Sequence, residues 1–218
     1  MAWGPATYEV KYQGPTPRVL RTESNGAHSG AGWATRDAPG PDDARYPEAR
    51  SFRLLDDSGV PFVHVRTEHP GSRGSGQPAV YRVDDHYGAP LGRVTYRRRP
   101  SFRVRRARWT LEPVQGPHLR GHRGRLVWWA VWWPTGLVLS WVCSIAAFMA
   151  EDDAGFRPPR RVTWRDGSGR TRLVFRGMSD RYEVRAGDTD PRLISALVAL
   201  HQSFDPSEDA GAFGWYHV

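Results

Sequence analysis

Cysteine is nearly absent from this sequence. Its 218 residues include one cysteine, Cys143. A single thiol cannot form an intramolecular disulfide, so the fold needs no oxidising compartment. The first residues, MAWGPATYEVKYQGP, also lack the basic start and the apolar run of a secretory signal. We therefore expect a cytoplasmic protein.

Catalytic signatures are missing as well. The sequence contains no hydrolase elbow, phosphate-binding loop, zincin helix or dinucleotide fingerprint. The Gly-rich stretch RDGSGRTR lies between two alternating runs, which is typical of a hairpin turn. Asp84, Asp85 and His86 are likewise more typical of a turn than of a metal site. We expect no enzymatic activity, no cofactor and no metal.

Lysine is almost absent too, and the positive charge is concentrated in one stretch. Residues 93 to 125 contain 11 arginines and one acid, Glu112, a local charge of +10; the remaining 20 basic and 22 acidic residues sum to −2. Basic side chains beside an apolar segment attract anionic lipid. The residues predicted to bind lipid phosphates are Arg97, Arg98, Arg99, Arg103, Arg105, Arg106 and Arg108.

Two other interpretations of these arginines stay open. The first is a solvated strand face in an arginine-rich protein. The second is a soluble nucleic-acid-binding protein, in which the basic stretch from Arg93 to Arg125 pairs with phosphates while Tyr96, Phe102 and Trp109 stack on bases.

Charge is absent from residues 126–150. This run is long enough to span a bilayer, and tryptophan favours the membrane interface. The predicted membrane-contacting residues are Trp128, Trp129, Trp132, Trp133 and Trp141. Three interpretations remain: strands of the core that turn at Pro134, a loop that dips into one leaflet, or a single membrane span. A single span would place the strands before and after it on opposite sides, and no single barrel could close.

The rest of the chain is dominated by β-hairpin patterns. From residue 52 onward, two alternating runs flank a polar turn with glycine in four segments: FRLLDDSGVPFVHVRTE, VYRVDDHYGAPLGRVTYRR, RWTLEPVQGPHLRGHRG and VTWRDGSGRTRLVFRG. Alternation with period two predicts half-buried strands, and Asp with Gly predicts the turns. Together with runs in 7–23 and 180–186 and the Trp-rich run, we count eleven or twelve strands.

One segment, residues 190–205, predicts a helix. Asp190 is a suitable N-cap, and Pro191 suits the first helical position. Its side chains are apolar on nearly every face, which indicates a helix buried inside the protein. About 14 residues at about 1.5 Å each span roughly 21 Å, which is too short for a bilayer.

Composition divides the chain further. Residues 24–50 are rich in Gly, Pro, Ala, Ser and Asp and predict a flexible linker. Residues 1–23 are expected to be a hairpin or a disordered arm. Residues 51–205 form the predicted barrel domain, with the helix and the apolar insertion 126–150, and 206–218 a loose tail.

Three stretches carry a resemblance to a known superfamily: YRVDDHYGAPLGRV, RWTLEP and YEVRAGDTDPRLISALVALHQSFD. In their order, the chain resembles the superfamily of tubby C-terminal domains, phospholipid scramblases and LURP-one-related proteins. The resemblance implies a mainly β fold, a closed antiparallel barrel of about twelve strands around a central hydrophobic C-terminal helix.

Together with the missing catalytic signatures, the basic stretch and the Trp-rich run, this resemblance leads us to expect a non-catalytic module at the cytoplasmic face of the membrane. It is expected to bind lipid or hold a ligand, with an anionic phospholipid surface as partner. The sequence departs from scramblases, because it has no Cys-rich palmitoylation tract and no acidic calcium loop. Calcium-activated scrambling is therefore not expected, and no phosphoinositide-contacting residue of tubby proteins can be assigned by position. The oligomeric state is not indicated.

Overall fold

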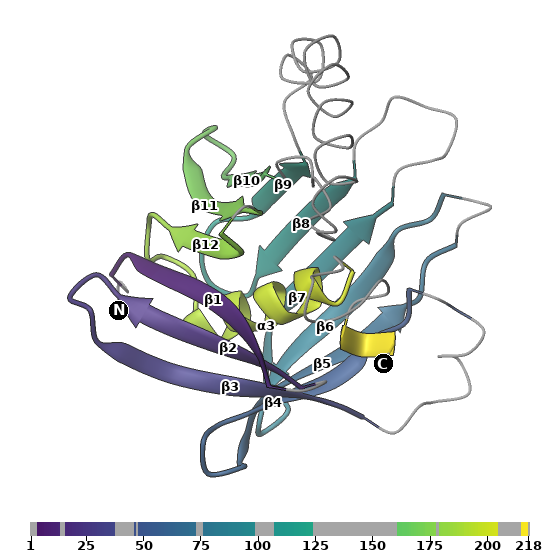
Figure 1. Ribbon diagram of the computed structural model, residues 1–218. Coiled ribbons are helices and arrows are strands. Elements are labelled where there is room, and N and C mark those ends of the chain that lie inside the picture. The colour runs from purple at the N-terminus through teal and green to yellow at the C-terminus, as the bar shows by residue number, and fades with distance from the viewer. Residues whose placement is uncertain are drawn as a thin grey trace, which may run out of the picture.

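The computed structural model describes residues 4–13, 16–37, 46, 48–72, 76–98, 107–123, 161–177, 179–204 and 215–217. These residues form a closed antiparallel barrel of twelve strands with the helix α3 inside it (Figure 1). The predicted fold class is therefore confirmed.

Each strand pairs with its neighbours in the sequence, and β1 pairs with β12 to close the barrel. The strands are β1 (Ala6–Gln13), β2 (Thr16–Glu23), β3 (His28–Arg36), β4 (Ser51–Leu55), β5 (Pro61–His69), β6 (Ala79–Asp85), β7 (Pro90–Arg97), β8 (Arg108–Pro113), β9 (Leu119–Arg123), β10 (Arg161–Arg165), β11 (Thr171–Arg176) and β12 (Arg181–Val184). All four hairpins predicted after residue 52 are present, as β4–β5, β6–β7, β8–β9 and β10–β11. Closure satisfies both hydrogen-bonding edges of every strand.

Three of the hairpins share one turn chemistry. In the β10–β11 turn, the Oδ1 atom of Asp166 accepts hydrogen bonds from the backbone N–H groups of Ser168 and Arg170 at 2.9 and 3.0 Å. Gly169 follows with a φ of +80°, a conformation that glycine adopts without strain. The same pattern recurs at Asp56 with Gly59 and at Asp85 with Gly88. The D-x-x-G sequence therefore fixes the turn through one carboxylate and one glycine.

The helix α3 (Pro191–Gln202) fills the barrel. Asp190 caps it as predicted, because its side chain accepts a hydrogen bond from the N–H of Arg192 at 2.8 Å. Nine of its twelve residues are buried, and it contacts strands on several sides of the barrel. Eight strands make a barrel that side chains alone can fill, whereas twelve enclose a wider space. A helix about 10 Å across fills that space.

The direction of α3 defines the two ends of the barrel. Near its start, Leu193 lies against Gly92 at the beginning of β7. At its other end, the ring of Phe204 lies 4.7 Å from the ring of Tyr96 at the end of β7. The helix thus runs in the same direction as β7. Phe204 therefore lies at the end of the barrel where β7 finishes and β8 begins.

A glycine in β9 makes room for the largest core side chain. Gly121 lies opposite Trp109 of β8 and opposite Trp164 of β10. A methyl group added at Gly121 would come within 3 Å of several atoms of the fully buried Trp164 indole. The indole therefore occupies the space that a side chain at this position would take.

Parts of the predicted domain boundaries are wrong. Residues 28–36, inside the predicted linker 24–50, form β3 between β2 and β4. The hairpin predicted as one alternative for residues 1–23 is present as β1–β2, but it belongs to the barrel, so the barrel begins at residue 6 rather than 51. Within the predicted tail, Trp215–His217 form the 3-10 helix η1, in which Trp215 and Tyr216 are buried.

The apolar run 126–150 lies outside the described residues. The strands on either side of it are hydrogen-bonded neighbours, with Arg123 of β9 opposite Val162 of β10. Among the described residues, no helix is both long and apolar enough to span a membrane.

Candidate functional site

The structure describes three of the seven arginines predicted to bind phosphate. Arg97 ends β7 and Arg108 begins β8, and the two lie directly opposite each other. Arg98 differs from these two, because it has a carboxylate partner: its Nη1 atom lies 3.7 Å from the carboxylate of Glu48. The remaining candidates, Arg99, Arg103, Arg105 and Arg106, lie outside the described residues, as do Trp128, Trp129, Trp132, Trp133 and Trp141.

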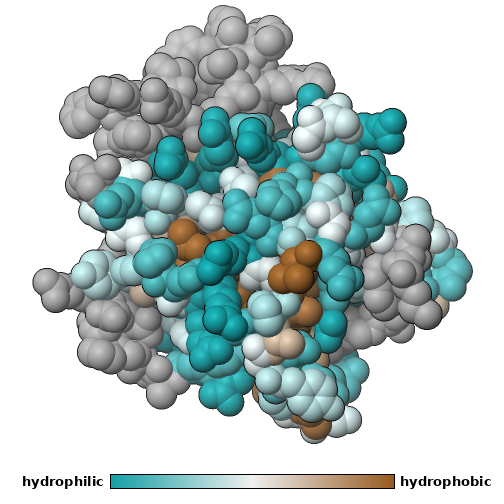
Figure 2. All heavy atoms as spheres, turned by 180° about the vertical axis from the view of Figure 1, so that it is seen from behind, coloured by the Kyte–Doolittle hydropathy of each residue, from teal (hydrophilic) through white to brown (hydrophobic). Residues whose placement is uncertain are grey.

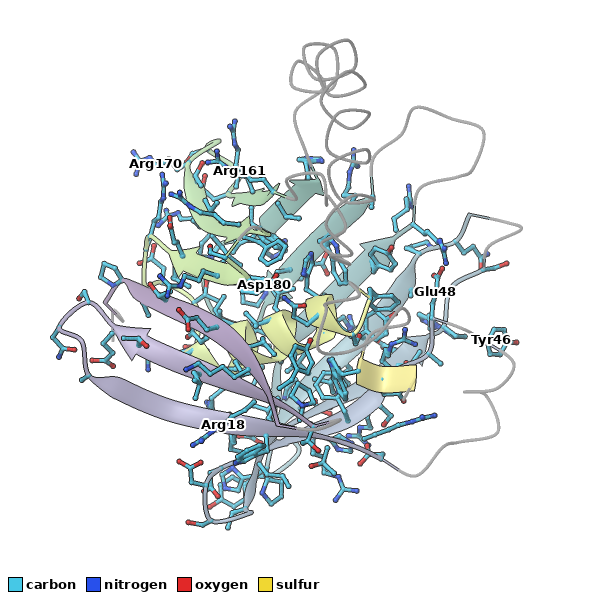
Figure 3. The ribbon with its side chains drawn as sticks, in the orientation of Figure 1. Arg18, Tyr46, Glu48, Arg161, Arg170 and Asp180 are labelled. Atoms are coloured by element: carbon cyan, nitrogen blue, oxygen red, sulfur yellow. The ribbon has the colours of Figure 1, made fainter. Side chains whose placement is uncertain are left out.

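Strand register adds three arginines that were not among the seven predicted to bind lipid phosphates. Arg120 of β9 lies opposite Arg165 of β10, and Arg161 begins β10. The inward positions of these strands are apolar, such as Leu119 and Val162, so alternation directs the arginines outward. Figure 3 shows Arg161 on the side of the barrel formed by β10 and β11.

We call this set the arginine face: Arg97, Arg108, Arg120, Arg161 and Arg165, all exposed on the outer surface of β7–β10. Neighbouring strands lie about 4.8 Å apart, so the four strands make a surface about 14 Å wide. The hydroxyl-bearing residues Thr95, Thr110 and Thr163 occupy outward positions between these arginines. Guanidinium and hydroxyl groups are both donors to phosphate oxygens.

The arginine face is distinguished by the lack of carboxylate partners. Among the described residues, no carboxylate lies within ion-pair distance of any of its five arginines. Most other surface arginines of the described chain do have such a partner: Arg18, Arg21, Arg53, Arg66, Arg82, Arg93, Arg172, Arg176, Arg181, Arg185 and Arg192. Glu112 lies opposite Arg93 at the border of the face. Asp166, which follows Arg165 in the sequence, binds Arg172 instead.

The neighbouring strands show what a neutralised arginine pair looks like. Arg66 and Arg82 lie opposite each other on β5 and β6, and both bind the buried Asp84, at 2.8 and 2.7 Å. Burial alone would raise the pKa of Asp84, but the hydrogen bonds from Arg82 and Arg66 outweigh it and lower that pKa. The carboxylate thus stays ionised between two arginines. In the part of the chain that the structure describes, the pairs Arg97–Arg108 and Arg120–Arg165 have no equivalent anion.

Like charges directly opposite each other on adjacent strands destabilise a sheet by up to about 1 kcal/mol per pair. The two unneutralised pairs therefore carry an electrostatic cost that a bound anion would remove.

The face of the molecule seen from behind shows no large apolar patch that could bind a partner instead. It is mainly hydrophilic, and its hydrophobic residues form small patches (Figure 2).

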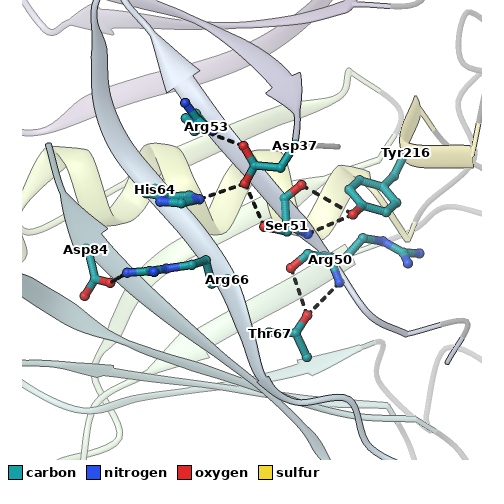
Figure 4. Close-up of polar contacts among 9 residues, drawn as sticks. All are labelled: Asp37, Arg50, Ser51, Arg53, His64, Arg66, Thr67, Asp84 and Tyr216. Atoms are coloured by element: carbon teal, nitrogen blue, oxygen red, sulfur yellow. Dashed lines mark hydrogen bonds and ion pairs between the residues drawn. The ribbon is translucent and has the colours of Figure 1, made fainter. Parts of the chain in front are cut away.

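A second polar cluster has the residue types of a catalytic triad but not its geometry. Asp37 accepts hydrogen bonds from the Ser51 hydroxyl and shares one with His64 Nε2, both at 2.7 Å (Figure 4). Burial would raise the pKa of Asp37, but the bonds from Ser51 and His64 lower it. Serine and histidine thus both bind the acid, whereas a triad needs the histidine to bind the serine.

The helix α3 places a histidine, His201, in the interior. Its Nδ1 atom lies 2.7 Å from the hydroxyl of Tyr182, and it is 5% exposed. The predicted turn role of Asp85 is confirmed, whereas Asp84 lies buried in the strand β6. In the described part of the chain, no group of three or more His, Cys, Asp or Glu residues is placed to hold a metal ion.

Comparison of the chain with protein-family models, with curated proteins and with solved structures returned no match.

Proposed function

We propose that this protein is a non-catalytic barrel that attaches to an anionic phospholipid surface through the arginine face. The observation that carries the proposal is the set of five exposed arginines on four adjoining strands, without a carboxylate partner among the described residues. The cytoplasmic leaflet carries anionic lipid and is the surface that such a face would meet in a cytoplasmic protein.

The arginine face alone gives weak attachment. Each basic residue near an anionic surface contributes about 1 kcal/mol, so five contribute about 5 kcal/mol, a Kd of roughly 0.2 mM. Stable attachment therefore needs a second contribution. The apolar run 126–150 begins three residues after Arg123, the last residue of β9. Its tryptophans are our candidate for that contribution.

The resemblance to the tubby and scramblase superfamily is part of this proposal. It rests on the order of the hairpins and the terminal helix in the sequence, and it points to the same class of partner. Neither scrambling nor recognition of a particular head group is included.

Nucleic acid is the alternative anion, and one observation argues against it. Two of the three aromatic residues expected to stack on bases turn inward: the ring of Trp109 lies 4.4 Å from that of Tyr96, and both contact Phe204 inside the barrel. The third, Phe102, lies outside the described residues. Trp109 is only 3% exposed. Single-stranded nucleic acids are usually held by exposed aromatic rings as well as basic groups, and these two rings are not available.

Vesicle sedimentation of the full chain tests the proposal. We expect the protein to sediment with vesicles that contain acidic phospholipid at low salt, to remain in solution with neutral phosphatidylcholine vesicles, and to lose binding as salt screens the charges. Single-stranded RNA serves as the competing ligand. Retention of RNA without sedimentation on acidic vesicles would contradict the lipid proposal and favour the nucleic-acid alternative.

A further inference from the structure

A short aromatic segment, Trp215–His217, lies in a socket formed by parts of the chain far away in sequence. The socket residues are Arg36 at the end of β3, Arg50, Ser51 and Phe52 at the start of β4, and Ala199 in α3. Trp215 and Tyr216 are 4% and 1% exposed there. The socket therefore buries both side chains almost completely.

Trp215 anchors the segment to the helix and to the barrel wall. Its indole Nε1–H donates a hydrogen bond to the backbone carbonyl of Ala199 at 3.2 Å. Its ring meets the ring of Phe52 edge to face, with centroids 5.2 Å apart. This one side chain thus has its apolar surface covered and its only polar group paired.

Tyr216 is held on both its ring and its hydroxyl. The guanidinium groups of Arg36 and Arg50 each lie 4.6 Å from the ring centroid. The hydroxyl accepts a hydrogen bond from the N–H of Ser51 at 2.8 Å and donates to the Ser51 carbonyl at 3.3 Å (Figure 4). Arg36 also donates to the carbonyl of Tyr216 at 3.1 Å. The Tyr216 hydroxyl thus forms hydrogen bonds with both the N–H and the carbonyl of Ser51, the first residue of β4.

These contacts have the composition of a peptide-recognition site: buried aromatic anchors, paired polar groups and flanking arginines. Ten residues, DPSEDAGAFG, separate Phe204 from Trp215 in the sequence. A ligand joined to its site by a linker of this length has an effective concentration in the millimolar range.

We propose that the socket is a binding site for a peptide with adjacent Trp and Tyr residues, and that the Trp215–His217 segment of this chain occupies it as an intramolecular ligand. The tethered segment keeps the site closed to free peptides at concentrations below the millimolar range. Cutting the chain between Phe204 and Trp215 makes the binding of the segment intermolecular and reversible, so that a second Trp-Tyr peptide can replace it. The site is separate from the arginine face and does not depend on lipid binding.

The test uses the full chain with a site for a sequence-specific protease inserted within 205–214. The chain is cut, the released segment is removed by size exclusion, and a fluorescent peptide AFGWYHV is titrated while its anisotropy is measured. We expect saturable binding to the cut protein and none to the uncut protein at micromolar peptide. A peptide with Phe in place of Tyr216 should bind about tenfold more weakly, because the N–H of Ser51 loses its acceptor.

Three results would overturn the proposal. The first is loss of the β-sheet circular dichroism signal on cutting, which would make the segment an inseparable part of the core. The second is a folded cut protein that binds no peptide. The third is equal binding of a control peptide that has Ala in place of both Trp215 and Tyr216.

Discussion

Arginine pairs on the outer surface of this barrel differ in whether a carboxylate neutralises them. On β5 and β6, Asp84 lies between Arg66 and Arg82 and neutralises a pair that would otherwise repel. On β7–β10 the equivalent pairs, Arg97–Arg108 and Arg120–Arg165, have no such acid among the described residues. The chemistry of the side chain is the same in both places, and the partner decides whether it stabilises the fold or remains available to bind an anion.

The first prediction concerns Asp84. Its pKa is lower in the folded protein than the value of about 3.9 in an unfolded chain. The folded state therefore favours the ionised form, and this stabilisation is present above pH 4 and is lost as the pH falls through the lower, folded pKa. Asp84→Asn should lower the free energy of unfolding at pH 7 by about 1 kcal/mol, since both arginines are about half exposed.

Urea unfolding at several pH values between 7 and 3 measures this effect. The wild type should lose more stability than the variant as the pH falls below 4. Asp57→Asn is the control, because Asp57 is 64% exposed in its pair with Arg18, and it should change stability by less than about 0.5 kcal/mol. The same pH dependence in the wild type and Asp84→Asn would contradict the role given to Asp84.

Among the elements, the hairpins and the helix were predictable because their signals are local. Alternation, an Asp-x-x-Gly turn and the cap formed by Asp190 are all contained within a few residues. The strand β3 was missed for the opposite reason. Its sequence HSGAGWATR shows little alternation, and its conformation depends on backbone hydrogen bonds to β2 and β4, which form only in the closed barrel.

The candidate site was predictable in part. Arg97 and Arg108 lie in the dense basic stretch that the sequence singles out, and β7 and β8 bring them together. Arg161 and Arg165 lie outside that stretch, and only the pairing of β9 with β10 places them on the same face. The signal was present at alternate positions of RVTWR and HLRGHR, but its use requires knowing the order of the strands.

The β10–β11 turn supplies a test at the scale of one element. Gly169 has a φ of +80°, so Gly169→Ala places a side chain in the left-handed region and should destabilise the protein by about 1 kcal/mol. Gly167 lies in the same turn, outside that region, and a methyl group there meets nothing within 4 Å. Gly167→Ala should therefore be neutral or slightly stabilising. Equal urea midpoints for the two variants would contradict the turn mechanism.

At the scale of the whole molecule, the interior and the exterior have separate roles. The interior is a closed aromatic and aliphatic core around α3, in which His201 is paired with Tyr182. On the exterior, most described arginines form ion pairs with carboxylates, whereas those of the arginine face have no such partner among the described residues. The barrel closes by pairing β1 with β12, and under our proposal this closed sheet holds the arginine face rigid. A rigid array of cations loses little conformational entropy when it meets an anionic surface.

The most direct measurement compares two double variants of equal charge change in vesicle sedimentation. Arg120→Gln with Arg165→Gln removes two cations from the arginine face. Arg176→Gln with Arg185→Gln removes two that pair with Glu183. The first variant should bind acidic vesicles roughly thirtyfold more weakly than the wild type, since about 2 kcal/mol is lost, while the second should bind within about threefold of it. Equal weakening by both variants would show that only net charge matters and would contradict the arginine face as the binding surface.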